Sequence, residues 1–252
     1  MQSQAITPSQ SPTPGHNLGI ASIPNMRDVG GFRTQDGGTV ARGHAYRSSQ
    51  LNNISPEDMQ KLADLKIRNV YDLRTEDERK KRPEELPPAV NYVVLDVLAD
   101  SPQAGPAMLE KLLEDPKAAN SHLGGGKIEA AFRQSYREFV SLPSARRGFR
   151  SLFLALGDKE QIPALFHCTT GKDRTGWAAA ALLSLLGVPK DRIIEDYLRS
   201  NNYILPVYQK VIRSFVAAGG DEEIPLAILG VRREYIDASF DEMQNKYGSI
   251  DN

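Results

Sequence analysis

The sequence predicts an α/β fold in which a central, mostly parallel sheet is flanked by helices. Short apolar runs rich in β-branched residues alternate with segments whose apolar residues recur at helical spacing. The run 162–166 is apolar throughout, which is typical of a central strand buried on both faces. With 252 residues and 40% hydrophobic content, the chain is long enough for one large domain that carries an insertion. We therefore expect a single domain over 20–252.

The overall charge excludes some classes of partner. A net charge of −1 gives no field for gripping nucleic acid or an anionic membrane, so any anion-binding site must be built locally. No run approaches the ~18 apolar residues of a membrane span, and residues 1–20 lack the basic-then-apolar layout of a signal peptide. We expect a cytoplasmic protein without integral membrane association and without a nucleic-acid partner. Secretion by a signal-independent route stays open.

Composition and turn residues predict the first elements. Residues 1–19 are rich in Ser, Pro, Gln and Thr and are expected to form a flexible tail. An Asp-Gly step at residues 36–37 indicates a hairpin, and a strand is predicted over 40–48. Arg27 and Asp28 come earlier, in a glycine-rich segment. We interpret them as an ion pair that anchors this segment.

A helix and two strands follow. Ser55 before a proline is typical of a helix N-terminus, which predicts a helix over 56–65. Strands are then predicted over 67–73 and 91–97. Asp72 and Asp96 lie at or near the carboxyl ends of these strands, where open parallel sheets bind their ligands. Each aspartate is therefore either a site residue or a structural cap or ion-pair partner.

The middle of the chain changes in composition. Residues 99–127 contain prolines and three consecutive glycines, and they are too long for an ordinary connection. This segment predicts an insertion, in the form of a helical lid. Residues 128–140 and 145–156 carry apolar side chains at helical spacing, and their aromatic residues are expected to pack in the core.

Cys168 is the one cysteine of the chain, so an intrachain disulfide and a structural zinc site made of thiolates are both excluded. It follows the apolar run 162–166, and an Ala/Leu-rich helix is predicted over 177–186. The polar segment between them places backbone N–H groups and a helix dipole around one point, as in anion-binding loops. Cys168 is therefore either inert core or a nucleophile beside an anion site.

The residues around Cys168 form a motif with a known counterpart. The motif runs Phe166-His167-Cys168-Thr169-Thr170-Gly171-Lys172-Asp173-Arg174-Thr175-Gly176. It resembles the His-Cys-x5-Arg-Thr phosphate loop of the cysteine-dependent phosphatases. Its Gly-Lys-Asp-Arg core is similar to the atypical bacterial and fungal tyrosine phosphatases, some of which also act on phosphoinositides. Further segments resemble other landmarks of that family, namely Asn25-Met26-Arg27-Asp28-Val29-Gly30-Gly31, Tyr46-Arg47-Ser48, Asp72-Leu73-Arg74 and Val231-Arg232-Arg233-Glu234-Tyr235. The likeness covers about 20–247 and implies a phosphatase-like fold.

The chemistry of the motif suits a phosphate monoester. Arg174 can donate two parallel N–H bonds to two phosphate oxygens and compensate charge in the transition state. A helix N-terminus and Arg174 favour the thiolate of Cys168, which predicts a thiophosphate intermediate. Thr175 can donate to the sulfur when water hydrolyses that intermediate, and His167 is expected to tune the loop from behind. The backbone N–H groups from Thr169 to Arg174 would bind the remaining phosphate oxygens.

Departure of the ester oxygen calls for a general acid. The chain has no Trp-Pro-Asp loop before the nucleophile, and the resemblance points to Asp173, since a neighbouring phosphate favours the protonated carboxyl. Asp72 and Asp96 are the second and third choices. The alternative for Asp173 is to hold the loop by bonding to its amides. Lys172 either adds positive charge that suits an inositol ring with more than one phosphate, or is a solvated loop lysine.

The predicted substrate-binding set consists of Thr169, Thr170, Gly171, Lys172 and Thr175. The predicted catalytic set consists of Cys168, Arg174 and Asp173, with His167, Asp72 and Asp96 in supporting roles. We expect a phosphotyrosine phosphatase of broad specificity that needs neither metal nor cofactor. A phosphoinositide phosphatase with the same loop is the alternative, and a catalytically weak phosphate-binding module is a third possibility. The expected partner is thus a phosphorylated protein or a phosphoinositide.

Overall fold

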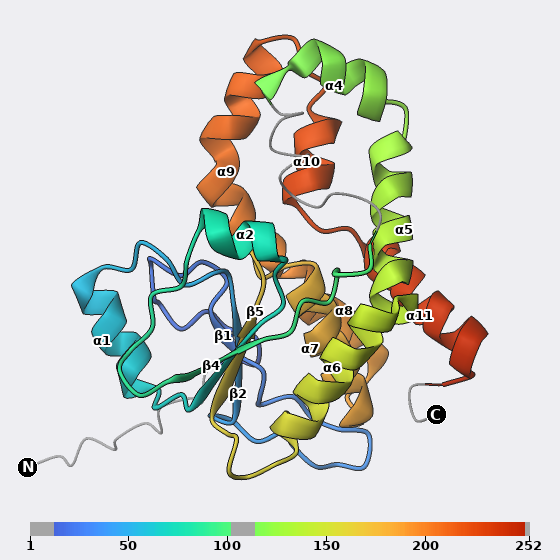
Figure 1. Cartoon of the computed structure of the whole chain (residues 1–252). Coiled ribbons are helices and arrows are strands. Elements are labelled where there is room, and N and C mark those ends of the chain that lie inside the picture. Colours follow the sequence, from blue (N-terminus) through green and yellow to red (C-terminus); the bar gives the residue numbers. More distant parts are fainter. Residues whose placement is uncertain (1–12, 102–113, 250–252) are drawn as a thin grey trace, which may run out of the picture.

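The computed structural model describes residues 13–101 and 114–249. Its centre is a five-stranded sheet in the order β1-β2-β5-β3-β4 (Figure 1). The strands are β1 (Arg27–Asp28), β2 (Ala45–Ser48), β3 (Asn69–Asp72), β4 (Asn91–Val94) and β5 (Ala164–His167). Only the edge pair β1–β2 is antiparallel, and the other three pairs are parallel. The predicted mostly parallel α/β sheet is confirmed.

The carboxyl ends of the parallel strands are level with one another. His167 at the end of β5 pairs with Ser48 of β2 on one side and with Asp72 of β3 on the other. Asp72 in turn pairs with Val94 of β4. The segments that follow these strands therefore start at the same edge of the sheet, which is the edge where parallel sheets bind ligands.

Helices cover both faces of this sheet. They are α1 (Pro56–Asp64), α2 (Glu76–Lys81), α4 (Pro116–Leu123), α5 (Lys127–Ser141), α6 (Pro143–Leu156), α7 (Arg174–Leu185), α8 (Lys190–Leu198), α9 (Ser200–Ala217), α10 (Glu223–Leu229) and α11 (Arg233–Tyr247). Neighbouring residues of β5 point to opposite faces, as the period of a strand requires. Leu165 packs in the cluster that includes Leu62 of α1, and Phe166 packs in the larger cluster with α5, α6, α7 and α11. The central run is apolar because both of its faces are buried.

A separate cluster of buried side chains holds a helical lobe together. It joins residues of α4, α5, α9 and α10, and Figure 1 shows α4, α9 and α10 gathered at one end of the molecule, beyond α2. The lid expected over 99–127 contributes α4 and the start of α5 to this lobe, and its residues 102–113 lie outside the described part. The lobe is thus built from two distant parts of the chain, because α9 and α10 complete it.

The ion pair expected between Arg27 and Asp28 does not form, and this prediction was wrong. The two residues are neighbours in β1, so their side chains point to opposite faces. Arg27 is buried and its Nη1 lies 2.5 Å from Oδ1 of Asp196. Asp28 instead accepts N–H bonds from Gly30 and Gly43 at 2.7 and 2.8 Å.

The last residues of the segment expected to be a flexible tail, 1–19, form backbone hydrogen bonds with the segment around β1. Asn17 forms a bridge to Arg27, and the N–H of Leu18 donates to the carbonyl oxygen of Met26 at 3.0 Å. Among the described helices, none combines the length and apolar character that a membrane crossing needs.

Candidate active site

Cys168 follows β5 directly and is 1% exposed. The buried strand delivers the cysteine to the carboxyl edge of the sheet, and α7 begins six residues later, at Arg174. Gly171, in the loop between them, has a φ of +66°, and a Cβ at this position would lie 2.2 Å from the carbonyl oxygen of Ser48. Glycine is therefore required for the loop to turn this tightly against β2.

The backbone N–H groups of this loop are available as donors. No N–H group of residues 169–173 donates a hydrogen bond to another described residue. The same groups surround the N-terminus of the α7 helix, whose dipole favours a negative charge at this end. Unpaired N–H groups at a helix N-terminus form a site for an anion such as phosphate. Thr169 and Thr170 are half-buried, so the loop remains accessible.

Arg174 lies at the start of α7 with its side chain 5% exposed. Its Nη1 and Nη2 donate to the two carboxylate oxygens of Glu78, each at 2.7 Å, and Nη1 also reaches the carbonyl oxygen of Leu73 at 3.4 Å. Burial alone would lower the pKa of Arg174, but the negative charge and hydrogen bonds of Glu78 outweigh this effect and raise it. Among described residues, none accepts from Nε or from the second Nη2 hydrogen. These two N–H groups are side by side, and they match two oxygens of a phosphate.

Glu78 holds the loop at two points, since it also accepts a hydrogen bond from the hydroxyl of Thr169. Burial alone would raise the pKa of Glu78, but Arg174 and Thr169 hold it well below its usual range. This role of Glu78 was not predicted from the sequence. Thr75 and Glu78 do form a capping box at the start of α2, which the Thr-x-x-Glu spacing indicates. The spacing gives no sign of a partner 96 residues away.

The structure places Asp173 beside two donors. Its Oδ1 accepts from the hydroxyl of Tyr136 and from Nζ of Lys172, both at 2.9 Å. The Tyr136 hydroxyl lies 2.7 Å from that of Tyr197, which extends the chain of hydrogen bonds. Asp173 precedes α7 but its side chain makes no cap bond to the helix. The alternative in which Asp173 holds the loop through its amides is therefore not the arrangement seen.

Lys172 is not solvated. It is 2% exposed, and its Nζ donates to the carbonyl oxygen of Gly230 at 3.0 Å and lies 5.2 Å from the ring centroid of Phe132. The alternative of a solvated loop lysine was wrong, because Lys172 is buried and lies against the ring of Phe132 of α5. Lys172 connects the loop to the segment between α10 and α11.

Asp72 and Asp96 differ in their surroundings. Asp72 is fully buried and is bound by Arg74, with Nη2 at 2.7 Å, and by the hydroxyl of Tyr92 at 2.6 Å. Burial alone would raise the pKa of Asp72. His167 and the bonds from Arg74 and Tyr92 outweigh it and keep this pKa below its ordinary value. Asp96 is half-buried, and burial raises its pKa. Asp72 thus acts as an ion-pair partner of Arg74, while Asp96 lies 3.9 Å from Arg79.

His167 is buried behind the loop. Its Nδ1 lies 3.3 Å from the carbonyl oxygen of Cys168, and its Nε2 has no hydrogen-bond partner. Burial lowers the pKa of His167 to about 4, so the ring is neutral at pH 7. The hydroxyl of Thr175 is also buried without a partner, which leaves it free to donate to a nearby acceptor.

One group of potential metal ligands occurs within the described ranges. It consists of Asp72, Glu84 and His167, whose ligand atoms lie within 4.8 Å of one another. The guanidinium of Arg74 contacts both carboxylates, so a cation is already in place among them. This arrangement does not suit a divalent metal.

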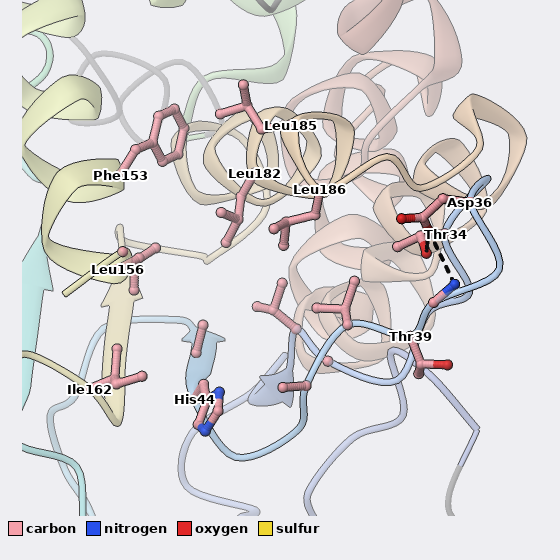
Figure 2. A pocket seen from close by; sticks show the side chains of 17 residues that line it. Thr34, Asp36, Thr39, His44, Phe153, Leu156, Ile162, Leu182, Leu185 and Leu186 are labelled. Carbon is pink, nitrogen blue, oxygen red and sulfur yellow. Dashed lines mark hydrogen bonds between the residues drawn. The ribbon is translucent and has the colours of Figure 1, made fainter. Parts of the chain in front are cut away.

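A cavity of about 530 Å³ lies elsewhere (Figure 2). It is lined by His44 and Ala45 at the start of β2, by Ile162 before β5, and by Leu182 and Leu186 near the end of α7. These residues mark the opposite ends of the same strands and of the same helix. The cavity is therefore remote from Cys168 and is not part of the candidate active site.

The fold and the site together define the class of the protein. A parallel sheet delivers a buried cysteine to a ring of unpaired N–H groups at a helix N-terminus, and an arginine stands on that helix with two donors free. These are the features that an anion-binding loop beside a reactive cysteine requires. The chain belongs to the tyrosine phosphatase family, which matches residues 18–252.

Two relatives of known sequence match over most of the chain. A Cupriavidus necator protein assigned to the tyrosine-protein phosphatases is 32% identical over 238 residues, covering 94% of this chain and 82% of that protein. The Mycobacterium tuberculosis triple specificity protein phosphatase PtpB is 30% identical over 250 residues, covering 90% of this chain and 88% of that protein. Among solved structures, that of P. aeruginosa TpbA matches 75% of this chain and 89% of that chain with 19% identity and a TM-score of 0.32.

Proposed function

We propose that this protein hydrolyses phosphotyrosine in proteins, with Cys168 as the nucleophile and Arg174 as the group that binds the phosphoryl oxygens. The observation that supports this most directly is the meeting of three features at one point. These are the buried thiol, the unpaired N–H groups of residues 169–173 and the free side-on N–H pair of Arg174. The family and the triple specificity of the PtpB relative support activity on phosphoserine and phosphothreonine as well.

The proposed reaction has two steps. The thiolate of Cys168 attacks phosphorus, the bond from phosphorus to the tyrosine oxygen breaks, and that oxygen takes a proton from Asp173. Water then attacks the thiophosphate, Asp173 accepts a proton from it, and the sulfur leaves as a thiolate. The hydroxyl of Thr175, which is buried without a partner, is free to donate to this sulfur. Both steps use protein groups and water alone.

The role proposed for Asp173 requires its protonated form in the first step. In the free protein its carboxyl group accepts hydrogen bonds from the Tyr136 hydroxyl and from Lys172. A phosphate dianion in the loop would add negative charge beside Asp173 and favour the proton. We expect Asp173→Asn to slow hydrolysis far more for alkyl phosphates than for an activated aryl phosphate, whose leaving group needs no proton. Equal slowing of both substrates would assign Asp173 a structural role instead.

Substrate class is tested with the wild type and the Cys168→Ser variant. Each is assayed on phosphotyrosine, phosphoserine and phosphothreonine peptides and on phosphoinositides, with and without a metal chelator. We expect the highest kcat/KM on phosphotyrosine peptides and a loss of all activity in Cys168→Ser. Preference for phosphoinositides would favour the lipid alternative. Phosphate binding without turnover by the wild type would indicate a binding module, and activity that survives in Cys168→Ser or disappears with the chelator would contradict the mechanism.

A further inference from the structure

Asn25 and Arg47 both donate to one carbonyl oxygen of the phosphate-binding loop. Asn25 Nδ2 and Arg47 Nη2 each lie 2.8 Å from the oxygen of Gly171. Asn25 precedes β1, whereas Arg47 belongs to β2, so two separate segments converge on the same peptide. Both residues are buried, at 0% and 1% exposure. Such a pair of buried donors fixes the direction of the carbonyl.

We propose that Asn25 and Arg47 are positioning residues, which hold the peptide between Gly171 and Lys172 so that the N–H of Lys172 faces the bound phosphate. In a trans peptide the C=O and the following N–H point in opposite directions. A carbonyl held from outside the loop therefore turns its N–H to the inside. The inference rests on the proposed function only for the claim that phosphate occupies the loop.

The neighbouring peptides follow the same rule. The carbonyl oxygen of Thr169 accepts from the N–H of Gln50 at 3.2 Å, and that of Cys168 lies 3.3 Å from Nδ1 of His167. The N–H groups of Thr170 and Thr169 therefore point away from Gln50 and His167, respectively. The carbonyl oxygen of Gly171 differs from these two because two side chains donate to it.

The Arg47 side chain is itself held in place. Its Nη1 lies 3.1 Å from Oδ2 of Asp196, whose Oδ1 binds Arg27. Burial and the neighbouring Arg47 lower the pKa of Arg27 to about 9, which leaves it charged at neutral pH. Two buried guanidinium groups thus share one carboxylate, and the positive charge in excess lies behind a loop that binds an anion. Arg47 is the member of this group that reaches the loop.

Asn25 makes this contact from an unusual backbone conformation. Its φ of +63° lies in the left-handed region, which few residues other than glycine and asparagine adopt readily. Within the described part of the chain, the other hydrogen bond of its Nδ2 goes to the hydroxyl of Ser200, at 3.4 Å. Glycine tolerates the same backbone, so Asn25→Gly removes the donor without imposing strain.

The test compares Asn25→Gly and Arg47→Lys with the wild type and with a matched control. The control is Asn53→Gly, which replaces an exposed asparagine whose φ is +54°. Binding of inorganic phosphate and orthovanadate is measured by calorimetry, and the Lys172 amide is followed by NMR as phosphate is added. These readouts do not require turnover, so they separate this proposal from the proposed function.

We expect phosphate to shift the Lys172 amide strongly in the wild type and in Asn53→Gly. In Asn25→Gly and Arg47→Lys the shift should shrink, and orthovanadate binding should weaken by about 10-fold to 100-fold, as when one hydrogen bond to a charged group is lost. Wild-type shifts and affinities in both variants would overturn the proposal. If one variant fails to fold, the other decides, and a folded variant with a normal Lys172 shift but slow turnover also contradicts it.

Discussion

Glu78 brings a negative charge to the edge of the proposed phosphate site. Its two oxygens occupy one N–H of each terminal nitrogen of Arg174, at 2.7 Å each. The N–H groups that remain on Arg174 lie along its Nε side, so Glu78 leaves this edge of the guanidinium for a phosphate in the proposed site. The same carboxylate binds the Thr169 hydroxyl and so connects the start of the loop to its end.

We predict that Glu78→Gln lowers kcat/KM by about 10-fold to 100-fold, because an amide can accept from only one of the two nitrogens and loses a charge-assisted bond of about 1.5–3 kcal/mol. Steady-state kinetics on an aryl phosphate measures the effect. Glu76→Gln is the control, since Glu76 is exposed on the same helix and pairs only with Lys80. A rise in activity would mean that Glu78 competes with the substrate.

Glu84 is a second carboxyl group with unusual surroundings. Its side chain is 4% exposed and its Oε2 lies 3.7 Å from Nε2 of His167. Oε2 accepts from the N–H of Leu51 at 2.8 Å. Oε1 contacts Arg74 without a well-aligned hydrogen bond. Burial, together with the nearby carboxylate of Asp72, raises the pKa of Glu84 to about 8. The folded protein therefore keeps a proton on Glu84 at neutral pH.

This proton predicts a pH dependence of stability. The unfolded chain releases it near the ordinary pKa of 4.5, and the folded chain releases it only near 8. Stability from this group is thus full below pH 4.5 and declines as pH rises to about 8, by at most ~1.4 kcal/mol per pH unit. The glutamine of Glu84→Gln cannot ionise. In urea unfolding, the free energy of unfolding of the variant relative to the wild type should therefore be higher at pH 8 than at pH 5.5. The same difference in free energy of unfolding between variant and wild type at both pH values would contradict a buried, protonated Glu84.

The contact between β2 and the phosphate-binding loop is set by backbone atoms. A Cβ at Gly171 would lie 2.2 Å from the carbonyl oxygen of Ser48, whereas a Cβ at Gly187 would meet nothing within 4 Å. Both glycines have positive φ, at +66° and +76°. An alanine at either position would have a strained backbone, but only at Gly171 would its methyl group also collide with another strand.

We predict that Gly171→Ala abolishes phosphate binding, since the loop must move away from β2 to admit the methyl group. Gly187→Ala should cost only about 1 kcal/mol of stability through its left-handed backbone, with activity unchanged. Thermal unfolding and phosphate binding of the two variants measure the difference. Equal effects would show that backbone strain, and not the approach to Ser48, governs this position.

The sequence predicted the elements better than their arrangement. Each strand expected from an apolar run overlaps one of the observed strands Ala45–Ser48, Asn69–Asp72, Asn91–Val94 and Ala164–His167. β1 was missed because it has two residues, both charged, and therefore no apolar pattern. The position of Cys168 between a strand and a helix followed from local residues alone. Glu78 and Asn25 were not predicted in their roles, because their partners lie 96 and 146 residues away.

The whole molecule consists of the sheet with its helices and the helical lobe. The lobe has its own buried cluster, which includes Ile128 of α5, Phe215 of α9 and Ile228 of α10. Lys172 bridges the two parts through the carbonyl oxygen of Gly230. A unit with its own core can open while the sheet stays folded.

We predict that Phe215→Ala weakens the lobe by about 3–5 kcal/mol, the range for removing a buried aromatic side chain. Hydrogen exchange should quicken in α9 and α10 but not in β5. Val216→Ala is the control, since Val216 is 39% exposed on the same helix. Faster exchange in β5 as well would show that the lobe and the sheet unfold as one unit.

The donors outside the loop bear on any attempt to move this site into another protein. The motif from His167 to Gly176 supplies the thiol, the N–H groups and the arginine, but Asn25, Arg47 and Gln50 hold its carbonyl groups. A graft of the ten-residue motif onto a different strand and helix would carry the reactive atoms without the peptide orientations. The smallest transferable unit is the motif together with residues 25–50, which contain β1, β2 and all three of these donors.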